Sequence, residues 1–159
     1  MVKAELIKQI ILALEESLQS ILTAATAAHQ TATHEESVAE NKYDTFGLEA
    51  AYLAEGLSRQ VEELSVAIQT YRNACFRDSA DGVIRLGSLI RLETEDGQAL
   101  DYFLGPAGGG INIPMEDRIC KVITPTSPLG QAVIGKEIDD EVSLTLHGRQ
   151  HTYIIRHTS

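Results

Sequence analysis

The chain has 159 residues, with 13 basic and 23 acidic side chains and a formal net charge of −10. A field of this sign repels phosphates, which excludes a protein that binds nucleic acid through its own charge. The length allows one domain or two small ones, and 43% hydrophobic residues is a normal globular value. We recognise no signal peptide and no apolar run near the roughly 20 residues that a membrane span needs, so we expect no membrane partner. Cys75 and Cys120 lack metal-type spacing and indicate reduced thiols of a cytoplasmic protein.

The first half of the chain predicts two helices. Residues 2–31 contain no glycine and no proline, and apolar residues recur there with steps of four and three. This first seam comprises Ile7, Ile11, Leu14, Leu18, Ile21, Ala25 and Ala28, and a second comprises Ala50, Ala54, Leu57, Val61, Leu64, Ile68, Tyr71 and Cys75. Two narrow seams of this length predict an antiparallel coiled coil. The facing pairs are centred on Ala39, so the hairpin is expected to turn near that residue, inside the acidic stretch 34–44.

From Gly82 onward the pattern changes to alternation, which predicts a small sheet domain. Strands are predicted over 88–94, 99–104, 119–124, 142–146 and 150–156. Strands with one helix among them indicate an α+β fold with a curved antiparallel sheet. We place the domain boundary where helical periodicity ends, giving a coiled-coil domain over 1–78 and a sheet domain over 79–159.

A short helix is predicted between the third and fourth strands. Ser127 is a good N-cap, and Pro128 suits the first helical position. Gly135 follows the predicted end at Ile134, as a glycine often does. The helix is therefore expected over 128–134.

The segment Ser127–Val142 reads Ser-Pro-Leu-Gly-Gln-Ala-Val-Ile-Gly-Lys-Glu-Ile-Asp-Asp-Glu-Val, and it resembles the C-terminal signature of the Gre-type (GreA/GreB family) bacterial transcription elongation factors. The stretch Glu40-Asn41, followed by Glu49-Ala50-Ala51 and Glu55-Gly56, resembles the same family. The resemblance implies an FKBP-like C-terminal domain that docks on RNA polymerase. Its docking residues would be Ser127, Pro128 and Lys136.

The resemblance also implies a role for the hairpin, whose tip is predicted near 35–44. The coiled coil would enter the secondary channel of the polymerase, and its tip would stimulate cleavage of backtracked transcripts. Glu36 and Glu40, with Glu35 as a further candidate, would hold magnesium shared with the polymerase, and Asn41 and Lys42 would be their neighbours. Carboxylates supplied in this way suit two-metal hydrolysis. The protein would then have no cofactor of its own, would not be an enzyme by itself, and would contact RNA and DNA only indirectly.

The tip departs from the family pattern. Cleavage factors carry Gly-Asp-x-x-Glu-Asn, whereas this chain has Glu36-Ser37-Val38-Ala39-Glu40-Asn41. Ser37 cannot replace the Asp as an anionic ligand. In a helix, Glu36 and Glu40 would share one face and could form a substitute pair. Two alternatives stay open, a channel-binding regulator without cleavage and a helical-hairpin adaptor, and the acidic residues would then be solvated near a helix N-terminus.

Three other sites are disfavoured by the sequence. His34 has no second His at helical spacing, so a dedicated metal site is not expected. The segment 105–110 lacks the Gly-Lys-Ser/Thr ending of a phosphate loop and is expected to be a surface loop. A prolyl isomerase would need an aromatic-lined pocket, and the second half has only Tyr102, Phe103 and Tyr153 for it.

Overall fold

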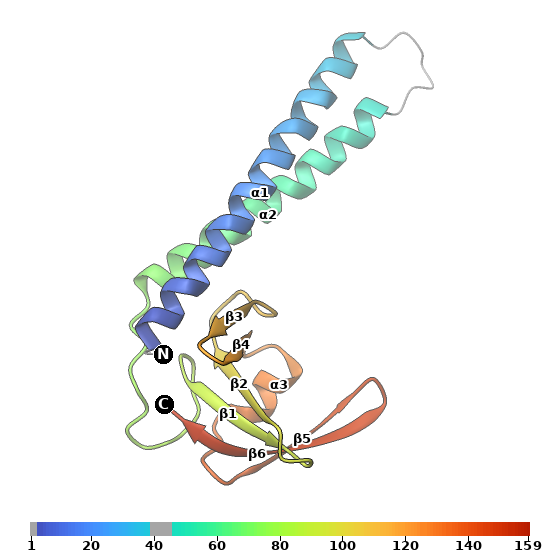
Figure 1. Cartoon of the computed structure of the whole chain (residues 1–159). Helices are drawn as coiled ribbons and strands as arrows, with labels where there is room; N and C mark the ends of the chain where they lie inside the picture. Colours follow the sequence, from blue (N-terminus) through green and yellow to red (C-terminus); the bar gives the residue numbers. More distant parts are fainter. Residues whose placement is uncertain (1–2, 39–45) are drawn as a thin grey trace. The chain divides into compact units, whose positions relative to one another are not determined.

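The computed structural model describes residues 3–38 and 46–159, and for residues 32, 34–38, 46, 47 and 50 it describes the backbone alone. Within this part of the chain, two long helices precede six strands and one short helix, as Figure 1 shows. The predicted α+β fold class is therefore confirmed. Contacts group the chain into a helical unit, Leu12–Gln69, and a sheet unit, Met1–Ile11 with Thr70–Ser159. The division at residue 78 stays a prediction.

The helical unit consists of parts of α1 (Lys3–Val38) and α2 (Phe46–Asn73), which run side by side in opposite directions (Figure 1). Leu14, Ala25 and Ala54 are buried, each at a predicted seam position. Leu18 and Leu57, also on the seams, are partly buried. The antiparallel helical hairpin follows from this pattern, because each helix removes one apolar stripe from water by packing on the other.

Two details of the seams differ from the prediction. In the first turns of α1, Leu6 and Ile10 are fully buried, whereas Ile7 and Ile11 are only partly buried. The buried face is shifted by one residue here, where α1 belongs to the sheet unit and has other neighbours. Cys75 is exposed and follows the end of α2 at Asn73, so it is not part of the second seam.

The chain reverses direction between Val38, the last residue of α1, and Phe46, the first of α2. The predicted turn residue, Ala39, is the first residue beyond the described part of α1. The two helix ends agree with a reversal in this region, and the predicted turn itself lies outside the described residues.

One segment of α1 has no charge. No Asp, Glu, Lys or Arg occurs between Glu16 and Glu35. By length and composition alone, Lys3–Thr31 is apolar enough to cross a membrane. The sequence expectation overlooked this helix, because its alanines raise the average hydropathy without forming an unbroken aliphatic run. Five hydroxyls of α1 bond to the backbone of the helix itself: Thr23 and Thr26 donate hydrogen bonds to the carbonyls four residues earlier, at 3.0 and 2.9 Å, and Ser17, Thr31 and Thr33 do the same.

The sheet unit is built on a single six-stranded sheet. Its strands are β1 (Leu89–Thr94), β2 (Ala99–Leu104), β3 (Asn112–Met115), β4 (Arg118–Ile123), β5 (Glu141–Leu146) and β6 (Arg149–Thr158). Their order is β3-β4-β2-β1-β6-β5. Five of these match predicted strands, with ends that differ by at most two residues.

The sheet is mixed, whereas the sequence predicted an antiparallel one. β2 and β4 pair in parallel, and the other neighbours are antiparallel. The cause is β3, which the sequence reading missed because Pro114 interrupts it. Proline is tolerated there because β3 is an edge strand. The chain passes from β2 to this edge and returns as β4 between the two strands, which makes β4 parallel to β2.

The core of the sheet unit lies on the face that α3 (Pro128–Val133) covers. Its buried side chains are Ile84, Ile90, Leu92, Leu104, Ile123, Val133, Val142 and Ile155. These residues come from the strands, from α3 and from the segment before β1, so the cluster packs these elements against one another. Burial of this set is the main driving force for folding of the unit.

An aromatic series connects the end of α2 to β2. The ring centroids of Tyr71 and Phe76 lie 5.9 Å apart, and Phe76 meets Phe103 edge-to-face at 5.6 Å. The Tyr71 hydroxyl donates a 2.6 Å hydrogen bond to the carbonyl of Ala107. Burial raises the pKa of Tyr71, so the phenol remains a donor. Gly105 is required beside it, because a Cβ at this position would overlap the hydroxyl.

The predicted loop 105–110 is held closely by β4. The amide of Gly105 donates to Ile123 at 2.8 Å, and the amide of Gly110 donates to Val122 at 2.9 Å. Gly105 is buried, so this part of the segment does not lie at the surface, contrary to the prediction. No helix starts after the loop, in agreement with the rejection of a phosphate loop.

Candidate functional site

The predicted tip residues fall into two groups. Glu35 and Glu36 belong to the last turn of α1, where the backbone is helical up to Val38. Glu40, Asn41 and Lys42 lie outside the described residues. The expectation that the acidic residues lie near a helix N-terminus is therefore wrong for Glu35 and Glu36, which lie near a C-terminus.

This end of α1 breaks a local electrostatic rule. The last turn contains no basic residue, although the helix macrodipole gives a C-terminal end partial negative charge. Carboxylates are disfavoured there by themselves, whereas a hard divalent cation is attracted both by the helix end and by carboxylate oxygens. Across residues 3–38 and 46–159, no group of three or more potential ligands could hold a metal ion.

The Gre-like segment begins with the N-cap of α3. The Ser127 hydroxyl accepts a 3.1 Å hydrogen bond from the amide of Gly130 and donates to the carbonyl of Thr124 at 2.7 Å. Pro128 occupies the first turn of the helix. Gly130 has no room for a side chain, because a Cβ would overlap the Thr124 carbonyl. The small residue of the motif is thus required by close backbone packing.

The second part of the segment forms the connection from α3 to β5. Gly135 has a positive φ of 79°, which glycine adopts without strain, and its amide donates to Ile84 at 2.8 Å. Asp140 accepts a 2.8 Å hydrogen bond from the amide of Glu137, and Val142 is buried in the core. Most residues of the motif therefore stabilise the fold.

The same segment leaves a small exposed surface. Pro128 and Lys136 are exposed, and Ile134 and Ile138 each keep 45% of their surface accessible. Apolar side chains on both sides of an exposed lysine are a combination suited to contact with another protein. The structure thus places two of the three predicted docking residues, Pro128 and Lys136, at the surface, whereas the Ser127 hydroxyl is used within the fold.

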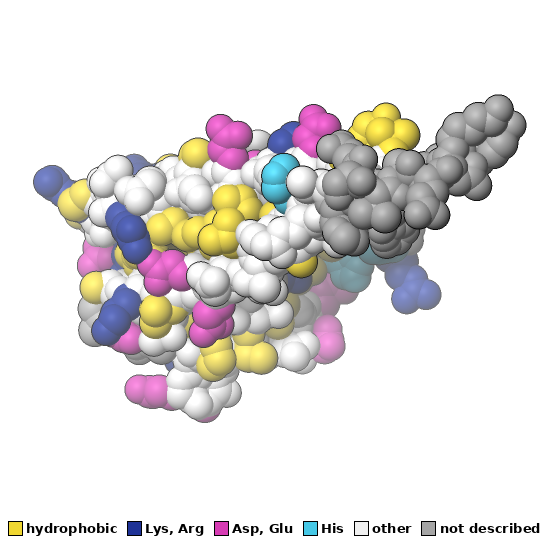
Figure 2. Space-filling view, turned by 90° about the horizontal axis from the view of Figure 1, so that it is seen from above, with side chains coloured by type: hydrophobic (Ala, Val, Ile, Leu, Met, Phe, Trp, Pro, Cys, Tyr) yellow, Lys and Arg dark blue, Asp and Glu magenta, His cyan; other side chains and the backbone are white. Residues whose placement is uncertain are grey.

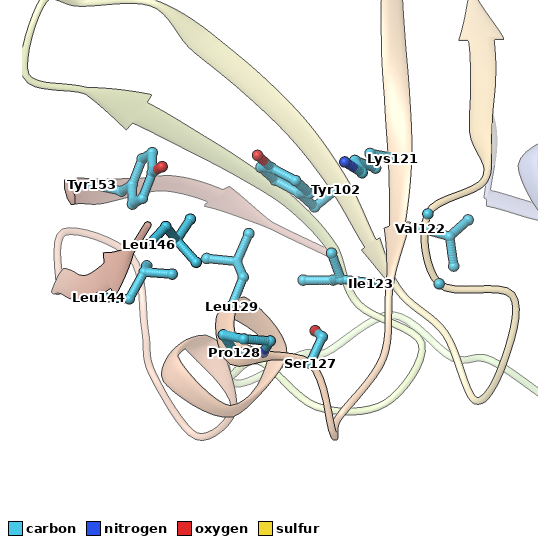
Figure 3. A pocket seen from close by; sticks show the side chains of 12 residues that line it. Tyr102, Lys121, Val122, Ile123, Ser127, Pro128, Leu129, Leu144, Leu146 and Tyr153 are labelled. Carbon is cyan, nitrogen blue, oxygen red and sulfur yellow. The ribbon is translucent and has the colours of Figure 1, made fainter. Parts of the chain in front are cut away.

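A cavity of the sheet unit lies beside α3. It measures about 270 Å³ and is lined by Tyr102, Gly109, Gly110, Lys121, Val122, Ile123, Ser127, Pro128, Leu129, Leu144, Leu146 and Tyr153. Figure 3 shows Leu129, Leu144 and Leu146 grouped between Tyr153 on one side and Tyr102 with Lys121 on the other. We call this cavity the tyrosine pocket. It is an apolar hollow with the polar groups of Tyr102, Lys121 and Tyr153 at its margin.

Two of the three aromatic residues considered for an isomerase line the tyrosine pocket. The third, Phe103, is fully buried and contacts Phe76 instead. The sequence analysis did not single out Lys121, Leu144 or Leu146 for this pocket. The missing information was the strand register, because only the parallel pairing of Tyr102 with Lys121 shows that these two residues are neighbours.

A second cavity lies in the helical unit. It measures about 480 Å³ and is lined by Leu22, Ala25, Thr26, His29 and Gln30 of α1 with Ser58 and Val61 of α2. Several positions of this lining have small side chains, namely Ala25, Thr26 and Ser58, which leave space between the two helices. On the face seen in Figure 2, uncharged and hydrophobic side chains form much of the surface, and the charged ones are scattered.

The comparisons with known proteins gave matches among solved structures. No family model and no curated protein matches the chain. The chain is similar to GreA factor homolog 1 (Gfh1) of Thermus thermophilus, at 20% identity over 94% of each chain with a TM-score of 0.40. It is similar to Thermus aquaticus Gfh1 at 21% identity, over 95% of this chain and 94% of that one, with a TM-score of 0.39. For the transcription elongation factor GreA/GreB from Nitrosomonas europaea, the identity is 17%, over 70% of this chain and 91% of that one, with a TM-score of 0.38.

Proposed function

We propose that this protein is a transcription factor that binds RNA polymerase and inserts its helical hairpin into the secondary channel. The observation that carries the proposal is the segment Ser127–Val142. It follows the Gre-type signature, and its cap, its glycines and its buried valine each have a structural reason in this fold. The exposed Pro128 and Lys136, with Ile134 and Ile138, would then contact the polymerase.

The hairpin supports the same proposal. α1 has 36 residues and α2 has 28, so the shorter helix alone spans about 42 Å at ~1.5 Å per residue. Such a pair can carry the residues between Val38 and Phe46 far into a narrow channel. The net charge of −10 would favour entry into a channel that handles nucleic acid and is therefore basic.

For the activity inside the channel, we propose stimulation of transcript cleavage by the polymerase. Glu36 and Glu40, with Glu35 as a further candidate, would hold magnesium together with the polymerase and orient a water. Asn41 and Lys42 would be adjacent to the reacting RNA. The metal would supply charge stabilisation and activation of that water. The protein would add only ligands to the catalytic centre of another enzyme, contact RNA and DNA indirectly, and act in the cytoplasm.

One observation favours a second candidate function, a channel-binding regulator without cleavage. Ser37 stands where cleavage factors carry an Asp, and a hydroxyl supplies no negative charge for the metal. The two candidates differ only in whether Glu36 or Glu35 takes that role.

A stalled, backtracked elongation complex with labelled RNA tests the proposal. Under the first candidate, addition of the protein shortens the transcript, and the double variant Glu36→Gln with Glu40→Gln abolishes the shortening. The matched control is Glu62→Gln with Glu63→Gln, which removes the same charge from exposed positions of α2 and should leave the shortening unchanged. Binding without shortening would establish the regulator instead.

Docking is tested separately by the affinity for polymerase. The Lys136→Ala variant should bind more weakly, and Lys8→Ala, another exposed lysine, should bind as the original protein does. Absence of polymerase binding by the unmodified protein would refute both candidates and leave a helical-hairpin adaptor.

A further inference from the structure

The tyrosine pocket has polar groups that the fold does not use. Among the described residues, the hydroxyls of Tyr102 and Tyr153 have no hydrogen-bond partner, and Lys121 has no carboxylate within ion-pair distance. Within the same part of the chain, five other cations of the sheet unit do have such carboxylates, whereas Lys136 and Arg149, like Lys121, do not: the paired ones are Lys3, Arg85, Arg91, Arg118 and Arg156. In a chain with excess acid, a cation left unpaired beside two unpaired donors makes the pocket margin complementary to an acceptor group.

The interior of the tyrosine pocket, unlike its margin, is apolar. Leu129, Leu144 and Leu146 face the hollow, and Ile123 continues this surface toward β4 (Figure 3). Gly109 and Gly110 form part of the wall without side chains, which leaves space at the mouth. At about 270 Å³ the cavity lies just below the usual range of small-molecule sites, so it suits a compact body of roughly a dozen non-hydrogen atoms.

We propose that the tyrosine pocket binds a small organic acid, with a compact apolar body among the leucines and one carboxylate at the margin. The carboxylate accepts hydrogen bonds from the Tyr102 and Tyr153 hydroxyls and pairs with the Lys121 ammonium, whose flexible stem allows it to reach the mouth. Burial, with Tyr153 nearby, raises the pKa of Tyr102, which keeps that phenol a donor throughout the physiological range. An alcohol of the same shape lacks the charge, and an amine is repelled by Lys121.

The test is a titration of the full ¹⁵N-labelled chain with 3-phenylpropionate, 3-phenylpropanol and 3-phenylpropylamine, followed by amide chemical shifts. We expect saturable shifts at pocket residues, with the carboxylate bound most tightly and the amine most weakly. Lys121→Gln should weaken the carboxylate roughly tenfold and leave the alcohol unchanged, because only a charge-assisted bond is lost. Lys8→Gln removes the same charge from an exposed site outside the pocket and should change neither.

A second variant tests the hydroxyls. Tyr153→Phe should weaken both the carboxylate and the alcohol by a similar factor, since each can accept from the phenol. Equal affinity for the carboxylate and the amine, shifts spread over the surface without saturation, or equal effects of Lys121→Gln and Lys8→Gln would each overturn the proposal. The titration contains no polymerase, so its failure would not affect the proposed transcription role.

Discussion

The contact between Tyr71 and the loop 105–110 allows a double-mutant test of how the end of α2 is joined to β2. The variants are Tyr71→Phe, Gly105→Ala and the two together. Tyr71→Phe removes the 2.6 Å hydrogen bond and leaves the Ala107 carbonyl without its donor. Its cost in the free energy of unfolding should be about 1–2 kcal/mol.

Gly105→Ala should cost more, about 2–4 kcal/mol. The new methyl group overlaps the Tyr71 hydroxyl, so the ring has to move and the same hydrogen bond is lost in addition to the overpacking. In the double variant the hydroxyl is absent, and the methyl group meets Tyr71 Cζ at 3.2 Å and Val122 Cγ1 at 3.3 Å, contacts that small shifts can relieve. The double variant should therefore be less destabilised than the sum of the single ones, by about 1–2 kcal/mol.

Urea unfolding of the four proteins measures this coupling, with circular dichroism for the helices and tyrosine fluorescence for the ring environment. Coinciding transitions of the two signals would establish that one free energy describes each protein. Additive costs would refute the reasoning, because they would mean that the methyl group and the hydroxyl do not compete for one space.

Three further predictions concern the sheet unit. Gly130→Ala should cost at least about 3 kcal/mol in thermal or urea unfolding, because its methyl group would overlap the backbone carbonyl of Thr124, which cannot rotate away as a side chain can. Ser127→Ala should cost only about 1 kcal/mol, the usual loss of an N-cap, and a cost as large as that of Gly130→Ala would contradict the described cap. Burial raises the pKa of Cys120 to about 12. The neutral thiol therefore contributes fully to the free energy of unfolding below the unfolded thiol's pKa of about 8.5, and this contribution is lost as the pH rises through the folded pKa. Iodoacetamide at pH 8 should accordingly modify the exposed Cys75 first and Cys120 only after urea is added; rapid modification of both in the folded protein would contradict the burial.

The elements that could be predicted from sequence are those whose signals are local. The heptad steps predicted both helices, and Ser127-Pro128 predicted that α3 begins at Pro128, where it is found. β3 was not predicted, because its alternation covers only four residues and includes Pro114, and a proline is acceptable in a strand only where tertiary structure makes that strand an edge. The parallel pairing of β2 with β4 depends on that missed strand.

The candidate sites divide in the same way. The capped segment Ser127–Val142 was found because its residues are adjacent in sequence and each has its own conformational requirement. The tyrosine pocket was not found, because Tyr102, Lys121 and Tyr153 come from three strands and meet only through register and sheet curvature. An isolated lysine within a strand carries no sequence signal until its neighbours in space are known.

The two helices of the hairpin have surfaces of different charge, which should respond differently to ionic strength. Between Glu16 and Glu35 α1 has no Asp, Glu, Lys or Arg, and threonines such as Thr26 bond their hydroxyls to the backbone, so contacts made there should change little between low and high salt. α2 carries four acidic and two basic residues, and attraction through this helix should weaken as salt screens it. A partner that surrounds the hairpin would thus be attracted at long range by the charges of α2 and would form short-range contacts with the uncharged surface of α1. Added salt should therefore lower the association rate constant more than it raises the dissociation rate constant.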